Sequence, residues 1–161
     1  MGDVLTTLGI DPGASCGLAV VTMWQGDKRR YEVLHHSTVK TDANEPLSLR
    51  LRSYALAVGA VLPKWPDIKQ AYIEVPWHGQ SIYTRGARNV YSLGVLLLIT
   101  GAVIAECHRH EIDVIEVPAP IGKRARNWEK QMRWQAEQLT NFTGGTGHEA
   151  VAVMLAVKGA R

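Results

Sequence analysis

Three apolar runs at the start of the chain are joined only by short turns, and this feature constrains the fold more than any other. The runs cover residues 4–11, 16–24 and 31–38, and the turns between them contain Pro12-Gly13 and Gly26-Asp27. Runs that are rich in β-branched residues and bounded by Gly, Pro and Asp are typical of strands. Turns this short allow only antiparallel pairing, because a parallel pair needs a long crossover. We therefore expect an antiparallel three-stranded sheet.

Helical and strand patterns alternate along the rest of the chain. Apolar residues at helical spacing predict helices over 47–62, 89–105 and 127–139, and a last helix that opens in the motif TGGTGHEA and ends at Val157. Strands are predicted over 69–75 and 112–117, each stopped by a proline. Asn44 is the expected N-terminal cap of the first helix, with Pro46 in its first turn.

This order of elements predicts an α/β fold. Strands that are separated by helices pair in parallel through crossover connections. The expected architecture is a five-stranded mixed sheet, with three antiparallel strands and two parallel ones, flanked by α-helices. The length of 161 residues suits a single domain over residues 1–161.

Composition limits the classes of protein to consider. The two cysteines, Cys16 and Cys107, are too few for a disulfide scaffold and fit reduced thiols in the cytoplasm. The first seven residues contain Asp3 and no basic segment before an apolar core, which argues against a secretory signal. The net charge of +3 is compatible with a nucleic-acid partner but does not establish one.

The segment 89–105 is uncharged and aliphatic, and its length is near the minimum for a membrane span. Polar residues interrupt it, and charged residues such as Arg88 and Glu106 crowd its ends. A helix that is apolar on all sides also suits a buried core or an oligomer interface. We therefore expect a buried or interfacial helix and no membrane partner.

Four acids stand at positions where α/β proteins form sites. Asp11 ends the first strand and should lie at the carboxyl edge of the sheet, although it could also stabilise its own turn. Glu74 and Glu116 lie in two copies of the motif IEVP, and nothing in the pattern separates them. Glu149 opens the last helix beside His148, where the helix dipole favours an acid in any case.

Together these acids suggest a site for a hard divalent cation. Carboxylate oxygens suit Mg²⁺ or Mn²⁺. A zinc site is less favoured, because the cysteines and histidines show no paired spacing. No G-x-S-x-G motif indicates a serine nucleophile.

Two stretches combine basic and aromatic residues. The segment 123–134 holds five cations (Lys123, Arg124, Arg126, Lys130 and Arg133), opposed by Glu129 and interleaved with Trp128 and Trp134. The segment 77–88 adds Trp77, His78, Tyr83, Arg85 and Arg88. Such residues can contact phosphates and stack on bases. A solvated helix face with two core-facing tryptophans is the alternative for the first stretch.

The order of these motifs resembles the RuvC Holliday-junction resolvases, within the RNase H-like nucleases, and compact phage resolvases are the nearest comparison. The segments that carry the resemblance cover most of the chain: LGIDPGASCGLAVV, AYIEVPWHGQ, SLGVLLLITGAVIAE, IDVIEVPAPIGKRA and HEAVAVMLA. The resemblance implies an RNase H-like sheet. It implies an active site of Asp11, Glu74 and Glu149, with His148 as a further ligand or proton carrier. It favours Glu74 over Glu116, which the bare pattern did not.

At the last helix, this sequence departs from the pattern of the family. The family usually has two metal-binding residues three positions apart there. With Glu149 in the second position, the first is Thr146, and with His148 in the first position, the second is Val151. The metal stoichiometry is therefore left open.

The implied activity is hydrolysis of branched DNA in the cytoplasm of a bacterium or a phage-infected cell. Two Mg²⁺ ions, or Mn²⁺ as a substitute, and no organic cofactor, would support symmetric paired nicks that leave 5′-phosphate and 3′-hydroxyl ends. Trp77 would wedge into the junction, and Lys123 would contact phosphate. A homodimer is expected to supply paired sites. It would pack through residues 91–105, where Gly94 and Gly101 share a face.

Three other readings stay open. The chain could be a nuclease of the same fold that acts on RNA, or a junction-binding protein without activity. An actin-like nucleotide-binding domain also begins with a strand, an Asp-Gly turn and a hairpin, but it needs a much longer chain.

Overall fold

The computed structural model describes residues 4–25, 29–76, 90–120 and 127–159. The strands are β1 (Val4–Asp11), β2 (Ser15–Trp24), β3 (Arg30–Lys40), β4 (Gln70–Val75) and β5 (Asp113–Pro118). The helices are α1 (Leu47–Val61), the short 3-10 helix η1 (Leu62–Lys64), α3 (Val90–Arg109), α5 (Trp128–Leu139) and α6 (Gly147–Gly159).

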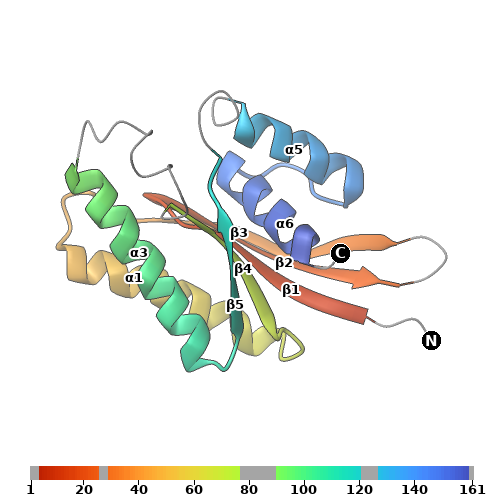
Figure 1. Ribbon diagram of the computed structural model, residues 1–161, viewed down its shortest axis with the longest axis horizontal. Coiled ribbons are helices and arrows are strands. Elements are labelled where there is room, and N and C mark those ends of the chain that lie inside the picture. Colours follow the sequence, from red (N-terminus) through yellow and green to blue (C-terminus); the bar gives the residue numbers. More distant parts are fainter. Residues whose placement is uncertain (1–3, 26–28, 77–89, 121–126, 160–161) are drawn as a thin grey trace.

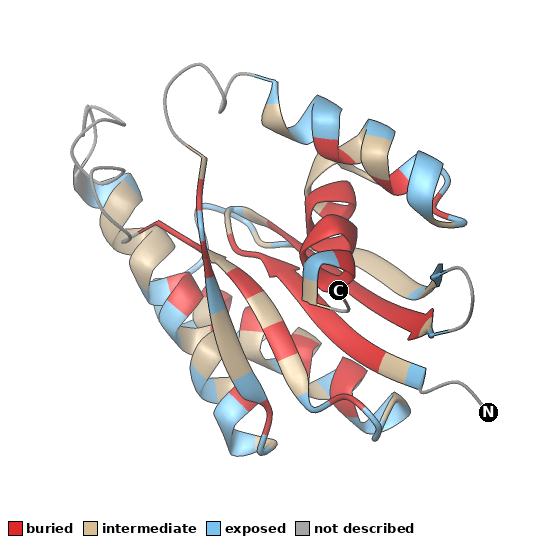
Figure 2. Cartoon of the chain, turned by 45° about the vertical axis from the view of Figure 1, so that its right-hand side comes forward, coloured by how far each residue is buried: buried red, intermediate tan, exposed pale blue. Residues whose placement is uncertain are grey.

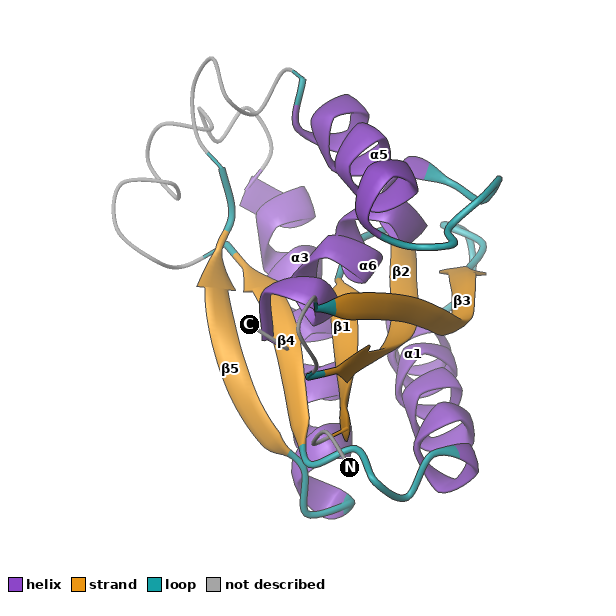
Figure 3. Cartoon of the chain, turned by 90° about the vertical axis from the view of Figure 1, so that its right-hand side faces the viewer, coloured by secondary structure: helices purple, strands orange, loops and turns teal. Residues whose placement is uncertain are grey.

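The strands form one mixed sheet in the order β3-β2-β1-β4-β5 (Figure 3). β1 pairs antiparallel with β2, and β2 pairs antiparallel with β3. β4 lies parallel to β1 on its other side, and β5 lies parallel to β4. The predicted α/β fold with a five-stranded mixed sheet is therefore confirmed.

Two helical layers cover the sheet. α1 and α3 lie against one face, and α5 and α6 lie against the other (Figure 1). Because side chains alternate along a strand, Leu18 and Val20 of β2 enter the core below α1 and α3. Ala19 and Val21 of the same strand enter the core below α6. The sheet thus separates two apolar cores.

Helix α6 is buried almost throughout, as Figure 2 shows. Residues 149–157 are all buried, and most of them are Ala or Val. The helix lies very close to the sheet because β1 and β2 present glycines to it. A Cβ atom on Gly9 would overlap the Ala152 carbonyl, and a Cβ atom on Gly17 would overlap the His148 carbonyl. These two glycines fix the distance between α6 and the sheet.

Helix α3 is longer than predicted and is only partly enclosed. Ile99, Val103 and Cys107 are buried against α1 and the sheet, whereas Tyr91 is 70% exposed and Leu98 is 50% exposed. Among the described residues, Tyr91–Arg109 is the one segment long and apolar enough to cross a membrane, with 28% of its apolar window buried. This is weak evidence, because core helices share these properties.

The predicted cap of the first helix is wrong. Pro46 occupies the N-cap position of α1, and no side chain caps the helix. The Asn44 N–H instead donates to Asp42 Oδ1 at 2.9 Å. Asp42 therefore organises this loop as an Asx turn, and Asn44 lies two positions before the N-cap and does not cap the helix.

The close approach of α6 to β1 predicts that Gly9→Ala is destabilising. Its Cβ would meet backbone atoms of Ala152 and Ala156, which cannot rotate away. We expect a loss of about 2–3 kcal/mol in the free energy of unfolding, measured by urea denaturation. Gly13→Ala is the control, because its Cβ would make only ordinary van der Waals contact with Ser15 O at 3.5 Å and Ser15 N at 3.9 Å. Equal stability of the two variants would contradict this packing.

Candidate active site

Asp11 and Glu74 emerge at the same edge of the sheet from neighbouring strands. β1 and β4 run parallel with Ile10 opposite Ile73, so the two acids occupy the next position on each strand. Ile10 and Ile73 both enter the core below α1 and α3. Because side chains alternate, Asp11 and Glu74 face the side of α5 and α6.

Glu116 does not join this pair. It lies on β5 opposite Ile73, one position out of step with Glu74, and it is exposed. The period of two therefore directs its side chain to the other face from Glu74. This register distinguishes two strand ends that carry the same IEVP motif.

Asp11 and Glu74 line a cavity of about 360 Å³. His148 from α6 and Glu129 from α5 line the same cavity. Its other walls include the turn after β1, Leu96 of α3, Trp128 of α5 and Val151 of α6. Five elements therefore converge on a space that three carboxylates and one imidazole share.

His148 bonds directly to Asp11. Its Nδ1–H donates to Asp11 Oδ2 at 2.7 Å. Asp11 is only 7% exposed. This hydrogen bond raises the pKa of the His148 imidazole above its usual value, against the opposing effect of burial, and the charges of Asp11, Glu129 and Glu74 act in the same direction as the bond. A protonated His148 thus supplies positive charge beside the carboxylates.

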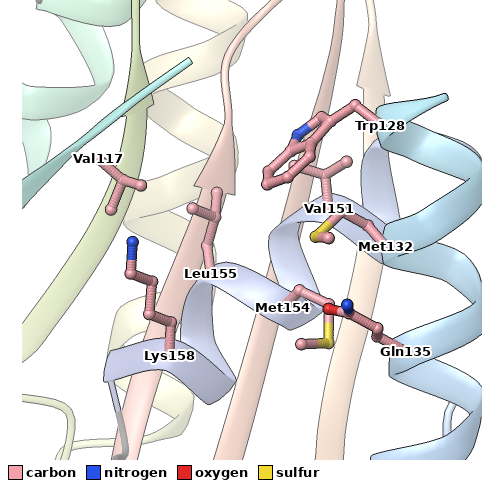
Figure 4. A pocket seen from close by; sticks show the side chains of 8 residues that line it. All are labelled: Val117, Trp128, Met132, Gln135, Val151, Met154, Leu155 and Lys158. Carbon is pink, nitrogen blue, oxygen red and sulfur yellow. The ribbon is translucent and has the colours of Figure 1, made fainter. Parts of the chain in front are cut away.

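Trp128 holds Glu74. Its indole Nε1–H donates to Glu74 Oε2 at 3.1 Å. A second cavity of about 190 Å³ lies between α5, α6 and β5 (Figure 4). Trp128 and Val151 line both cavities. Apart from Gln135 and Lys158, its lining is apolar or aromatic. We assign the chemistry to the larger cavity.

Glu149 points away from this cavity. Thr38 Oγ1 donates to Glu149 Oε1 at 2.5 Å, and the His36 imidazole donates to Glu149 Oε2. The backbone N–H of Glu149 donates to Thr146 Oγ1 at 3.2 Å. Burial alone would raise the pKa of Glu149, but the hydrogen bonds from Thr38 and His36 hold it below its usual value. Glu149 therefore joins α6 to β3.

The structure brings together three of the four predicted catalytic residues. Asp11, Glu74 and His148 line one cavity, and Glu149 does not. Successive helical residues point about 100° apart, so His148 and Glu149 do not share a face. Of the two registers left open for the last helix, the one with His148 and Val151 faces the cavity.

The donor set suits a hard divalent cation, but it is not assembled around one. Carboxylate oxygens with one imidazole are ligands that Mg²⁺ and Mn²⁺ accept. Within the described ranges, no three His, Cys, Asp or Glu side chains already lie close enough to hold a metal ion. His148 is bonded to Asp11, and Trp128 is bonded to Glu74. Binding would require the imidazole proton to leave and these side chains to move.

Most predicted DNA-binding residues fall outside the described part of the chain. These are Trp77, His78, Tyr83, Arg85 and Arg88 in one segment, and Lys123, Arg124 and Arg126 in the other. Lys130 lies on α5 and is exposed. Arg133 donates to the carbonyls of Gly144 and Gly145, at 3.2 and 3.0 Å, so it holds the loop before α6.

The sequence did not indicate two residues that the site contains. Trp128 was noted only for stacking or packing, yet it bonds to Glu74. Glu129 was noted only as the acid within a basic stretch.

No protein-family model matches the sequence, and no curated protein matches it. Solved structures do. A structure of Thermus thermophilus RuvC in complex with a Holliday junction substrate has a TM-score of 0.73 at 18% identity, covering 97% of this chain and 93% of that chain. The chain has the fold of a RuvC Holliday-junction resolvase. The resemblance found in the sequence is therefore confirmed at the level of the fold.

Two viral proteins share this RuvC fold more distantly. The Fowlpox virus resolvase, in complex with Holliday junction DNA, has a TM-score of 0.54 at 13% identity and covers 94% of this chain and 96% of that chain. A human cytomegalovirus terminase nuclease domain, soaked with Mn and bound to an inhibitor, has a TM-score of 0.53 at 12% identity. It covers 96% of this chain and 83% of that chain.

The position of Glu149 predicts a structural role that does not need metal. Glu149→Ala should lower the free energy of unfolding at pH 7 by about 2–3 kcal/mol in EDTA, because His36 and Thr38 lose a buried acceptor. Its folded pKa lies below 4.5, so the charge-dependent stabilisation is complete above pH 4.5 and is lost as the pH falls through the folded pKa.

Urea denaturation at pH 7 and at lower pH measures this effect, with the exposed Glu137→Ala on α5 as the control. If Glu149→Ala left the metal-free protein as stable as the wild type, Glu149 would instead belong to a group of mutually repelling metal ligands.

Proposed function

We propose that the chain is a metal-dependent endonuclease that resolves four-way or otherwise branched DNA. The observation that supports this most directly is the shared cavity of Asp11, Glu74 and His148, at the edge of a RuvC-like sheet. Two acids from adjacent parallel strands face a third donor from a buried helix there. A fold alone would not carry the proposal, because one fold hosts many activities.

The cofactor in this proposal is Mg²⁺, with Mn²⁺ as a substitute and two ions in each site. When bound, such ions activate water and stabilise the leaving oxygen, giving 5′-phosphate and 3′-hydroxyl ends. Asp11, Glu74 and His148 are the residues that would hold them. No organic cofactor is required.

The other residues of the site have positioning roles in this proposal. The Trp128 indole keeps the Glu74 carboxylate turned toward α5. Glu149 and Thr38 fix the first turn of α6, and this turn presents His148 to Asp11. When the His148 proton leaves, the imidazole gains a free lone pair and can act as a ligand or accept a proton from water.

The substrate in this proposal is a four-way DNA junction. Two similar structures are of resolvases in complex with Holliday junction DNA. The predicted phosphate and base contacts come from the basic and aromatic residues of segment 77–88, from Lys123, Arg124 and Arg126, and from Lys130. A role in DNA recombination and repair, as a single nuclease domain in the cytoplasm of a bacterium or a phage-infected cell, follows from this substrate.

A homodimer would supply the two cuts that resolution needs. The open face of α3 supports this part of the proposal. Tyr91 and Leu98 expose apolar surface on it. A Cβ atom on Gly94 or Gly101 would meet no atom within 4 Å. A second copy could therefore approach this helix closely, as small residues at a helix interface allow.

Cleavage of an end-labelled synthetic four-way junction tests the proposed activity. The wild type should give symmetric paired nicks in Mg²⁺ and leave a matched linear duplex largely intact. Asp11→Asn should cut at least about 100-fold more slowly, because a charged group that stabilises the reaction is lost. A gel shift in Ca²⁺ should show that it still binds. Glu116→Gln is the matched control and should cut like the wild type.

Other outcomes would replace this proposal. Binding without cleavage by the wild type, in both Mg²⁺ and Mn²⁺, would identify a junction-binding protein without activity. If the wild type showed no preference for the junction over linear duplex, RNA substrates would become the next choice.

The dimer proposal predicts that a charge on the open face of α3 separates the subunits. Leu98→Glu should sediment as a monomer at a concentration where the wild type sediments as a dimer, because a carboxylate would be buried at an apolar interface. Leu56→Glu is the control, since Leu56 is 58% exposed on the neighbouring α1. A wild-type monomer, or a Leu98→Glu dimer, would contradict an interface on α3.

A further inference from the structure

The wall that α5 contributes to the large cavity carries a carboxylate that the proposed function has not used. Glu129 lies in the first turn of α5 and lines the same cavity as Asp11, Glu74 and His148. Within the described residues, its carboxylate makes no hydrogen bond or ion pair. Glu129 is exposed, so its carboxylate is open both to solvent and to the cavity that it lines.

Helix capping does not explain Glu129 either. Asn127 occupies the N-cap of α5, and no side chain forms a capping hydrogen bond there. The Glu129 carboxylate instead lies over Gly147. A Cβ atom on Gly147 would overlap Glu129 Oε2 and lie 3.0 Å from the Glu129 carboxyl carbon. Gly147 directly precedes His148, so the carboxylate reaches the first turn of α6.

Two contacts hold α5 in this position. Trp128, the preceding residue, donates to Glu74 at 3.1 Å. Arg133, one helical turn later, donates to the carbonyls of Gly144 and Gly145. Residues four apart lie on the same side of a helix, so Glu129 and Arg133 both face α6 and the loop before it. The first turns of α5, which carry Glu129, are thus held by a contact to β4 and a contact to the loop before α6.

The face that α6 turns to the cavity offers one donor. His148 and Val151 are three positions apart and both line the cavity. Val151 has no atom that can bind a cation. Glu129 lines the same cavity from α5. Val151 therefore shares the cavity with a carboxylate, Glu129, that can bind a cation.

We propose that Glu129 is a further ligand of the active site and contributes to binding the divalent cations that Asp11, Glu74 and His148 would hold in the same cavity. This inference rests on the proposed function, because it assigns a further ligand to that site. With His148 neutral, three carboxylates carry a charge of −3, which suits one or two divalent ions better than two carboxylates do. In this proposal α6 contributes only His148 as a ligand, and the remaining ligand, Glu129, comes from α5.

Metal binding, measured apart from cleavage, tests this assignment. Free Mn²⁺ is titrated against the full chain and followed by electron paramagnetic resonance, for the wild type, Asp11→Asn, Glu129→Gln and Glu137→Gln. Glu129→Gln should weaken Mn²⁺ binding by at least about 10-fold. Glu137→Gln, on the same helix and exposed, should bind like the wild type.

The melting temperature in EDTA separates a ligand from a structural residue. A ligand predicts that metal-free Glu129→Gln melts at or above the wild-type temperature, because one of several neighbouring carboxylates loses its charge. A lower melting temperature together with unchanged Mn²⁺ affinity would assign Glu129 to structure and overturn the proposal.

The same titration distinguishes this inference from the proposed function. If Asp11→Asn lost Mn²⁺ binding and Glu129→Gln kept it, Glu129 would not be a ligand and the proposed site would stand. If the wild type bound no Mn²⁺, both the metal site and the role of Glu129 would be wrong.

Discussion

The contact of α6 with β1 and β2 is the constraint on which the rest of the structure depends. It exists because Gly9 and Gly17 leave room for helix backbone directly above the strands. Thr7 strengthens it by donating to the Ala156 carbonyl at 2.8 Å. With the helix held this close, two adjacent residues of its first turn reach opposite sides. His148 meets Asp11, and Glu149 meets β3.

Strand register supplies the other half of the site. β1 and β4 are neighbours, parallel and in step, so Asp11 and Glu74, near the carboxyl ends of these strands, reach one edge of the sheet and face the same side. α5 then closes the cavity through Trp128 and Glu129. The proposed metal site therefore depends on three independent alignments: β1 with β4, α6 with the sheet, and α5 with α6. A shift of any one of them would separate the donors.

Sequence patterns predicted what local periodicity and turn chemistry determine. The five strands, the pairing of the first three and the placement of Asp11 follow from apolar runs, short turns and a strand end. Glu74 and Glu116 were equivalent in pattern, and the resemblance to a known family separated them. The structure gives a physical reason, which is the one-residue offset between β4 and β5. No local pattern encodes that offset.

The last helix shows what local sequence patterns could not predict. The resemblance to a known family placed Glu149 among the ligands, but which face of α6 meets the cavity depends on where two strand glycines position the helix. Asn44 was expected to cap α1 because cap propensity is local, whereas Asp42 organises that loop. The enclosure of α3 also depended on its neighbours, and α1 and the sheet cover only one side of it.

The central claim is that Asp11, Glu74 and His148 form a site for a divalent cation. Anomalous diffraction from crystals soaked in Mn²⁺ tests it most directly, because it locates the ion without reference to activity. The account predicts an anomalous peak in the large cavity, within coordination distance of Asp11, Glu74 and His148. An empty cavity at saturating Mn²⁺, or a peak beside Glu149 and His36 instead, would contradict it.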